Sequence, residues 1–363
     1  MSAPEPRPEV VGAALPDPFT EIRMTALAAT RGANFWSRRP VTRMDLVVGA
    51  YEDIASDEVP GFTDRLLAAL PGLVEHRCSI GERGGFVTRL RRGTYAPHIV
   101  EHVALELQTI MGHDVGFGRT RGGEADDEYT LVFEHLHEAV GLRAAAHALA
   151  VVQEAFAGTV PAVDHIAAEL AAIAAEPDAP APTAHVRCAI TGGGPRAAAR
   201  DEIARRVGAD DAGRLVVEVS PGYILQAGLP YGRSDVAVVL DTDVTDVPER
   251  YRDVERARRL VSVVADGVRR GGLVIAPAKE WEVQDYARDA HCRVAVFSTR
   301  DDVTPRDRKV ARAAAWVADG HVVVEELGTR TDAGPLLPDV PAAAQVAATL
   351  AEFAMRQRDD GRG

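Results

Sequence analysis

The sequence predicts an α/β protein of two domains, an α+β domain followed by a domain built on a parallel sheet. Its 363 residues exceed what one hydrophobic core usually serves. The Pro/Ala-rich stretch at 174–184 lacks a hydrophobic period and is typical of a semi-rigid linker. Beyond it, short β-branched runs alternate with helical segments, as in a parallel sheet covered on both faces. We therefore expect a flexible tail at 1–29, the first domain at 30–160, a helix and linker at 161–184, the second domain at 185–355 and a second flexible tail at 356–363.

In the first domain, strands and helices are expected in mixed order. The runs MDLVVGAY at 44–51 and YTLVFE at 129–134 are predicted strands. The period of apolar residues at 61–73, 97–112 and 138–158 predicts helices. In the second domain, six short apolar runs are the expected strands: 186–193, 215–220, 235–241, 272–277, 293–298 and 321–326. The segment 248–271 is an expected helix, and the alternation is typical of a Rossmann-like sheet.

Charge and composition argue against several classes of partner. The formal net charge of −13 disfavours nucleic acid, whose binding depends on neutralised phosphates. No apolar run is long enough to span a membrane, and the first thirty residues lack the basic and apolar regions of a secretory signal, so we expect a cytoplasmic protein. The scattered Cys78, Cys188 and Cys292 predict reduced thiols, with neither a disulfide framework nor a thiolate metal site.

The segment 98–102 has the order HxxEH. Residues four apart lie on one helix face, so His98 and His102 can direct two imidazoles at one ion while Glu101 lies beside them. In that arrangement zinc is bound by the histidines and the glutamate acts as the general base. The motif also occurs by chance, and the competing interpretation is a helix whose polar residues face solvent.

A catalytic zinc site needs a third protein ligand. Glu106 lies about 12 Å along the helix from His98, too far to share an ion with it, and is expected to be a partner of His102 instead. Glu134, at the end of a predicted strand, is the first choice for the third ligand, and Glu138 is the alternative.

Several strings resemble the N-terminal domain of the cyanophycin synthetases over roughly residues 30–155. These are GANFWS at 32–37, EVPGF at 58–62, EHRCS at 75–79, RGGF at 83–86, HIVEHVALELQ at 98–108 and GFGRTR at 116–121. The resemblance implies a metallopeptidase-like site that cuts cyanophycin, an aspartate backbone bearing arginines, with His98, Glu101 and His102 at the positions of the hydrolytic motif. Basic side chains in these strings and nearby are candidate ligands of substrate carboxylates, or else a solvated basic surface: Arg83, Arg91, Arg119 and Arg121.

The second half resembles a degenerate Mur ligase-like domain, the C-terminal module of the same synthetases. In place of the family's TGTNGKT phosphate loop, Gly192 and Gly194 are followed by Pro195, Arg196 and Ala197, so a backbone donor, the lysine and the hydroxyl that binds Mg²⁺ are missing. ATP and Mg²⁺ are therefore not expected to bind. The family's intervening ATP-grasp domain is also missing, so synthesis of the polymer by this chain is not expected.

These observations favour a zinc-dependent amide hydrolase acting on cyanophycin or a related Asp/Arg-type peptide. The alternative is a non-catalytic relative that binds the polymer, or that associates with a true synthetase and regulates it. The family resemblance also suggests a homo-oligomer. A residual ATP-dependent ligase is the least favoured interpretation because of the changed phosphate loop.

Overall fold

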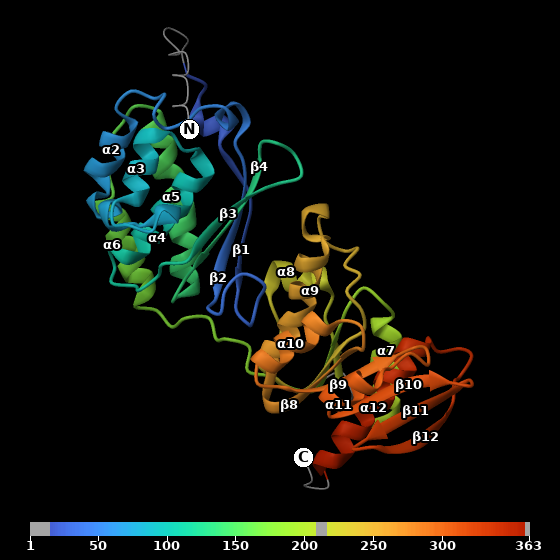
Figure 1. Cartoon of the computed structure of the whole chain (residues 1–363). Coiled ribbons are helices and arrows are strands. Elements are labelled where there is room, and N and C mark those ends of the chain that lie inside the picture. The colour runs from blue at the N-terminus through green and yellow to red at the C-terminus, as the bar shows by residue number, and fades with distance from the viewer. Residues whose placement is uncertain (1–14, 208–215, 360–363) are drawn as a thin grey trace. The chain divides into compact units, whose positions relative to one another are not determined.

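Two compact units make up the chain, and each is described by itself. The computed structural model describes residues 15–207 and 216–359 (Figure 1). Unit 1 lies within Met1–Thr30 and Arg39–Ala179, and unit 2 lies within Arg31–Arg38 and Pro180–Gly363. The end of unit 1 at Ala179 thus falls within the predicted linker at 174–184. Residues 31–38, expected in the first domain, belong to unit 2, where the Trp36 indole N–H donates to the Leu225 carbonyl at 3.1 Å.

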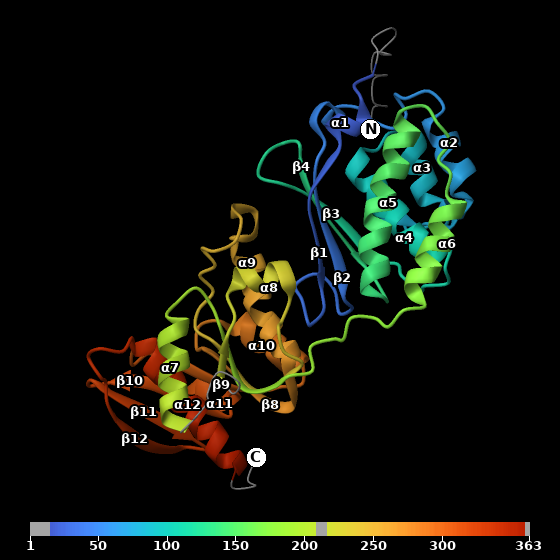
Figure 2. The same ribbon diagram turned by 180° about the vertical axis from the view of Figure 1, so that it is seen from behind.

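Unit 1 is built on a four-stranded antiparallel sheet in the order β1-β2-β4-β3. Its strands are β1 (Arg23–Thr30), β2 (Val41–Val47), β3 (Gly118–Gly122) and β4 (Glu128–Glu134). Figures 1 and 2 show the main helices gathered on one side of this sheet. Alternating side chains of β4, such as Leu131 and Phe133, join the core on that side, as expected for a sheet with one buried face.

The helices on that side of the sheet include the three that the sequence predicts, with shifted ends. They are α2 (Phe62–Ala69), α4 (Ala96–Thr109) and α5 (Glu138–Phe156), together with α3 (Gly85–Arg92) and α6 (Asp164–Ala174). The first helix stops before Pro71, which begins the short 3-10 helix η2 (Pro71–Glu75), because proline cannot continue an α-helix. Two more 3-10 helices are η1 (Gly49–Glu52) and η3 (Cys78–Ile80).

The predicted tails are shorter in the structure. From residue 15 onward the N-terminal segment holds α1 (Pro18–Glu21) and the edge strand β1. Most side chains of β1 are exposed, so the sequence has little apolar alternation there to predict a strand. At the other end, α12 (Ala342–Asp359) runs well into the predicted tail. The remaining predicted tail residues, 1–14 and 360–363, lie outside the described part of the chain.

Unit 2 contains an eight-stranded sheet in the order β12-β11-β10-β9-β8-β7-β5-β6. The strands are β5 (His185–Thr191), β6 (Val216–Glu218), β7 (Arg233–Val239), β8 (Val268–Pro277), β9 (Arg293–Ser298), β10 (Ala313–Ala318), β11 (His321–Glu326) and β12 (Thr329–Pro335). The six strands β5 to β10 pair in parallel, which confirms the prediction of a parallel sheet. The strand β11 pairs antiparallel with both β10 and β12, and the sequence prediction includes β11 but missed β10, β12 and this antiparallel pairing.

Helices cover both faces of the unit 2 sheet. Alternating side chains such as Ile190 and Val238 share a core with α7 (Arg196–Val207) and α12, while α10 (Trp281–Asp289) packs against β8 and β9. The other helices are α8 (Pro221–Ala227), α9 (Val254–Ser262), α11 (Pro305–Val310) and the 3-10 helices η5 (Glu249–Tyr251) and η6 (Val263–Gly267). The predicted helix at 248–271 is thus broken into short pieces, and its last residues begin β8.

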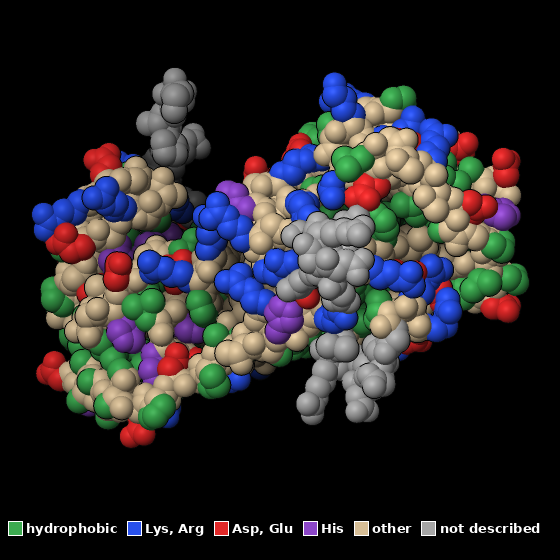
Figure 3. Space-filling model, turned by 90° about the horizontal axis from the view of Figure 1, so that it is seen from below, with side chains coloured by type: hydrophobic (Ala, Val, Ile, Leu, Met, Phe, Trp, Pro, Cys, Tyr) green, Lys and Arg blue, Asp and Glu red, His purple; other side chains and the backbone are tan. Residues whose placement is uncertain are grey.

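Basic and acidic side chains both reach the surface in the space-filling view of Figure 3. Among the described helices, none has the length and apolar character needed to cross a membrane.

Candidate metal centre

The helix α4 carries the HxxEH residues into the interior of unit 1. It begins at Ala96, with Pro97 in its first turn, where a missing backbone N–H costs nothing. Most of the helix is buried, so Glu101 and His102 are only 5% and 6% exposed. The prediction that His98 and His102 lie together on one helix is confirmed, because their rings are 4.8 Å apart between centroids. The competing interpretation of a solvent-facing helix is wrong for these residues.

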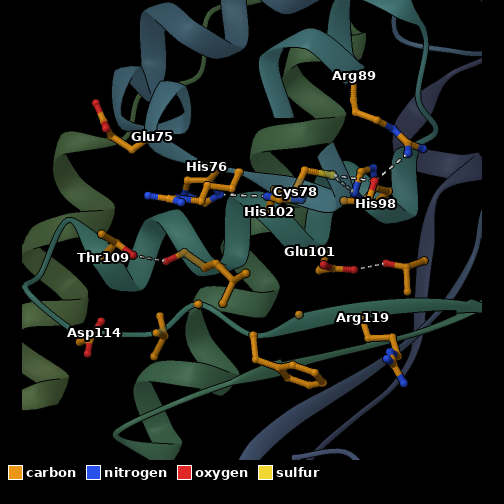
Figure 4. Close-up of a pocket in the computed structure, with 18 residues that line it drawn as sticks. Glu75, His76, Cys78, Arg89, His98, Glu101, His102, Thr109, Asp114 and Arg119 are labelled. Carbon is orange, nitrogen blue, oxygen red and sulfur yellow. Dashed lines mark hydrogen bonds between the residues drawn. The ribbon is translucent and has the colours of Figure 1, made fainter. Parts of the chain in front are cut away.

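A thiol completes the candidate metal site. One possible ligand atom from each of Cys78, His98 and His102 lies within 4.8 Å of the others. The Cys78 Sγ is 3.3 Å from His98 Nε2 (Figure 4). Cys78 lies on η3 with a φ of 54°, a left-handed conformation that is uncommon for a residue with a side chain and that tends to mark functional positions. The expectation that no thiolate contributes to a metal site therefore does not fit Cys78.

The structure does not bring the expected carboxylates to this cluster. Glu134 ends β4 with its Oε2 3.7 Å from Arg39 Nη1, and Glu138 begins α5, where its backbone N–H donates to Asp178. Neither lines the cavity that holds the histidines. Strand ends are a reasonable place to look for ligands, but Cys78 lies on the short 3-10 helix η3, whose position depends on tertiary contacts.

The chemistry of the three donors fits zinc. Thiolate sulfur and imidazole nitrogen are common zinc ligands, and three protein ligands leave one position open for catalysis. Burial lowers the pKa of His98 to about 4, with a smaller effect of Arg89. Burial also lowers the pKa of His102 to about 2, with smaller effects of His98, His76 and Arg89. Both rings are therefore neutral at pH 7, which is the form that binds metals.

Glu101 lies in the same cavity and is held in one orientation. The Thr120 hydroxyl of β3 donates to its Oε2 at 2.5 Å. Gly118 lets this strand pass close by, because a Cβ there would lie 2.5 Å from Glu101 Oε1. Burial raises the pKa of Glu101 to about 7, against the opposing effects of the Thr120 hydrogen bond and the Arg119 charge. A carboxyl group with that pKa can both accept and release a proton near neutrality.

The cavity around these residues has a volume of about 970 Å³, large enough for a short peptide segment. In Figure 4, Arg89 and Arg119 lie to one side of the cluster, whereas Glu75 and Asp114 lie to the other. The Arg89 guanidinium donates to Ser79 Oγ at 3.1 Å. The cavity is therefore polar at both sides, with opposite charge.

Of the four arginines predicted to contact substrate, Arg119 lines the cavity. Arg83 forms an exposed ion pair with Glu75, and Arg91 pairs with Asp64 at 3.2 Å. Arg121 is exposed near the end of β3 and does not line the cavity. Arg89, which the sequence marks only as part of a basic cluster with Arg91, also lines the cavity. Arg77 and His76 line it too, and the sequence prediction did not single them out because nothing in their local spacing marks them.

The segment 192–197 of unit 2, where the sequence predicts a degenerate phosphate loop, uses its backbone groups in internal hydrogen bonds. The Gly193 N–H donates to Asp241 Oδ1 at 2.7 Å, and the Arg196 guanidinium at the start of α7 donates to the Gly192 carbonyl. A Cβ at Gly194 would lie 2.3 Å from Asp241 Oδ2. An internal carboxylate thus faces the backbone at the place where a phosphate loop would bind an anion.

Comparison with known proteins identifies the domain that holds the cluster. Residues 43–157 match the family described as the cyanophycin synthase-like N-terminal domain. The cyanophycin synthetases of Crocosphaera subtropica and Synechocystis sp. are 52% and 50% identical to this chain over 118 residues, which are 31% of this chain and 13% of each relative. The chain thus spans only 13% of the length of the curated relatives it matches.

Solved structures of Mur ligases also match. MurF ligase from Thermotoga maritima has a TM-score of 0.35 and 10% identity, covering 50% of this chain and 47% of that one. MurF from Acinetobacter baumannii has a TM-score of 0.33 and 12% identity, covering 47% of this chain and 43% of that one. The resemblance carried by the sequence strings of the first domain is confirmed over residues 43–157, which match the cyanophycin synthase-like N-terminal domain.

Proposed function

We propose that unit 1 is a zinc-dependent hydrolase of peptide amides, with cyanophycin or a related Asp/Arg-type peptide as its substrate. The observation that carries this proposal is the cluster of Cys78, His98 and His102 beside the buried Glu101 in one cavity. When bound, zinc supplies a Lewis acid and lowers the pKa of a bound water to about 7.

Glu101 is the proton carrier of the proposed reaction. Its carboxylate takes a proton from the attacking water and returns it to the departing amine nitrogen. Thr120 holds Oε2, so Oε1 is the atom free to exchange the proton. Burial keeps the group in a low-dielectric environment and raises its pKa to about 7, which suits both halves of the transfer.

The charges around the cavity support a substrate with both signs of charge. Arg119 is half-buried, and its guanidinium makes no hydrogen bond or ion pair within the described part of the chain, so it can receive a carboxylate. Asp114, on the other side, suits a guanidinium of the substrate. A polymer of aspartate bearing arginines presents both groups along its length.

A second candidate is a non-catalytic partner of a true synthetase that binds polymer without cutting it. The observation that favours it is the hydrogen bond that the Gly193 N–H of the unit 2 loop donates to Asp241, a residue of the same chain. Measured zinc content separates the two, because the hydrolase requires one zinc per chain and the partner does not.

The proposal is tested by incubating the full chain with cyanophycin and following the products by mass spectrometry. We expect cleavage that a chelator abolishes and added zinc restores. Glu101→Gln should retain zinc but lose about 10²- to 10⁴-fold in turnover, the usual contribution of a general base. Glu154→Gln on α5 is the matched control and should be unchanged, since it lies outside the cavity. Equal turnover of the Glu101→Gln protein would refute the proposed mechanism.

A further inference from the structure

We propose that Glu106 and His76 act together as a positioning relay that directs the Nε2 lone pair of His102 at the metal. This inference rests on the proposed zinc site and adds two residues that do not themselves belong to the metal-binding cluster. The sequence suggested Glu106 as a direct partner of His102. In the structure a second histidine stands between them.

The relay consists of two hydrogen bonds in series. Glu106 lies one helical turn after His102 on α4, and its Oε2 is 2.9 Å from His76 Nε2. The other nitrogen of His76, Nδ1, is 2.9 Å from His102 Nδ1. Glu106 is 3% exposed, so the relay is shielded from solvent at its carboxylate end. Hydrogen bonds in such an environment are stronger than in water.

The order of donors follows from the carboxylate. A carboxylate oxygen accepts, so the His76 Nε2 carries a hydrogen and donates it to Glu106 Oε2. With that ring hydrogen on Nε2, His76 accepts at Nδ1. His102 Nδ1 must therefore donate to it, and the single hydrogen of the neutral His102 ring is placed on Nδ1. Its Nε2 is left without a hydrogen, as metal binding requires.

Thr94 contacts the Nδ1 of His98, the second proposed histidine ligand, as His76 contacts the Nδ1 of His102. His98 Nδ1 is 2.8 Å from Thr94 Oγ1, while its Nε2 is the atom that lies 3.3 Å from Cys78 Sγ. A histidine that binds a metal through one ring nitrogen usually makes a hydrogen bond to another group through the other. Here Nδ1 makes that bond and Nε2 is left for the metal.

Packing holds the relay in this geometry. Gly72 allows η2 to approach α4, because a Cβ at this position would lie within 1.9 Å of Glu106 Oε1. The Phe86 ring stacks on the His102 ring with centroids 3.9 Å apart and an interplanar angle of 18°. The ring of His102 therefore cannot turn without displacing neighbours on two elements.

The test is a double-mutant cycle on zinc affinity, measured in the full chain by competition with a chromophoric chelator. Removal of an outer partner of a metal ligand typically weakens metal binding by about 10- to 100-fold. We expect such a loss for His76→Phe and about a 10-fold loss for Glu106→Gln. Because Glu106 acts through His76, Glu106→Gln should add nothing in the His76→Phe background. His76→Gln, whose amide oxygen can still accept, should restore part of the affinity.

A control variant and the possible outcomes distinguish failure of the proposed relay from failure of the proposed zinc site. His147 and Glu169 form a similar pair at 2.9 Å elsewhere in unit 1, and His147→Phe should leave zinc affinity unchanged. Independent, multiplying losses for His76→Phe and Glu106→Gln, or no loss in either, would overturn the relay while leaving the zinc site intact. A wild-type chain without stoichiometric zinc would overturn the proposed function as well. If circular dichroism shows that His76→Phe does not fold, the same cycle is run with His76→Ala, which also removes both ring nitrogens.

Discussion

Replacing Cys78 by Ala tests the part of the site that the sequence did not predict. The thiol is the only non-histidine ligand atom in the candidate cluster, so its loss leaves the two imidazoles of His98 and His102. Zinc held by four protein ligands is bound with about 10–16 kcal/mol, or roughly 2.5–4 kcal/mol for each ligand. At about 1.4 kcal/mol for each power of ten, Cys78→Ala should weaken zinc binding by about 100- to 1,000-fold.

The assay is the zinc dissociation constant, measured by chelator competition on wild type and variants. In the cobalt-loaded wild-type chain, a thiolate-to-metal absorption band should be present, and Cys78→Ala should lose it. Cys292→Ala, which removes a buried thiol of unit 2, is the matched control and should retain both zinc and the band. Glu134→Gln should also retain zinc, since Glu134 does not line the cavity.

Two results would refute this reasoning. One is a Cys78→Ala protein that binds zinc as tightly as wild type. The other is loss of zinc in Glu134→Gln with Cys78 intact, which would restore the carboxylate that the sequence suggested as the third ligand.

Two further predictions concern the surroundings of Glu101. Gly118→Ala places a Cβ 2.5 Å from Glu101 Oε1, so it should cost about 1–3 kcal/mol of unfolding free energy and lower kcat, checked by denaturant unfolding and steady-state kinetics. An unchanged kcat would show that Glu101 does not need its present position. Arg119→Ala should raise KM for a carboxylate-bearing substrate by about tenfold or more, because a charge-assisted hydrogen bond contributes about 1.5–3 kcal/mol. Arg91→Ala should leave KM unchanged, since Arg91 pairs with Asp64 at the surface and does not line the cavity. Equal effects of the two arginine variants would contradict this assignment.

Local patterns predicted the elements that depend on near neighbours in the chain. The helix of α4 and the shared face of His98 and His102 follow from the four-residue period, which tertiary contacts did not alter. The parallel strands of unit 2 were predicted because strands buried on both faces have continuous β-branched runs in their sequence. The edge strand β1 was missed because its exposed side chains lack that pattern.

The sequence by itself determined that His98, Glu101 and His102 share one helix, and it predicted that a zinc site there needs a third ligand. Tertiary structure decided which side chain lies beside the two histidines, because Cys78 reaches them from η3, 20 residues before His98 in the chain. It also decided that His76 stands between Glu106 and His102. The physical reason is the same in both cases, since helix geometry fixes neighbours at three and four residues, whereas loops acquire their positions only when the core packs.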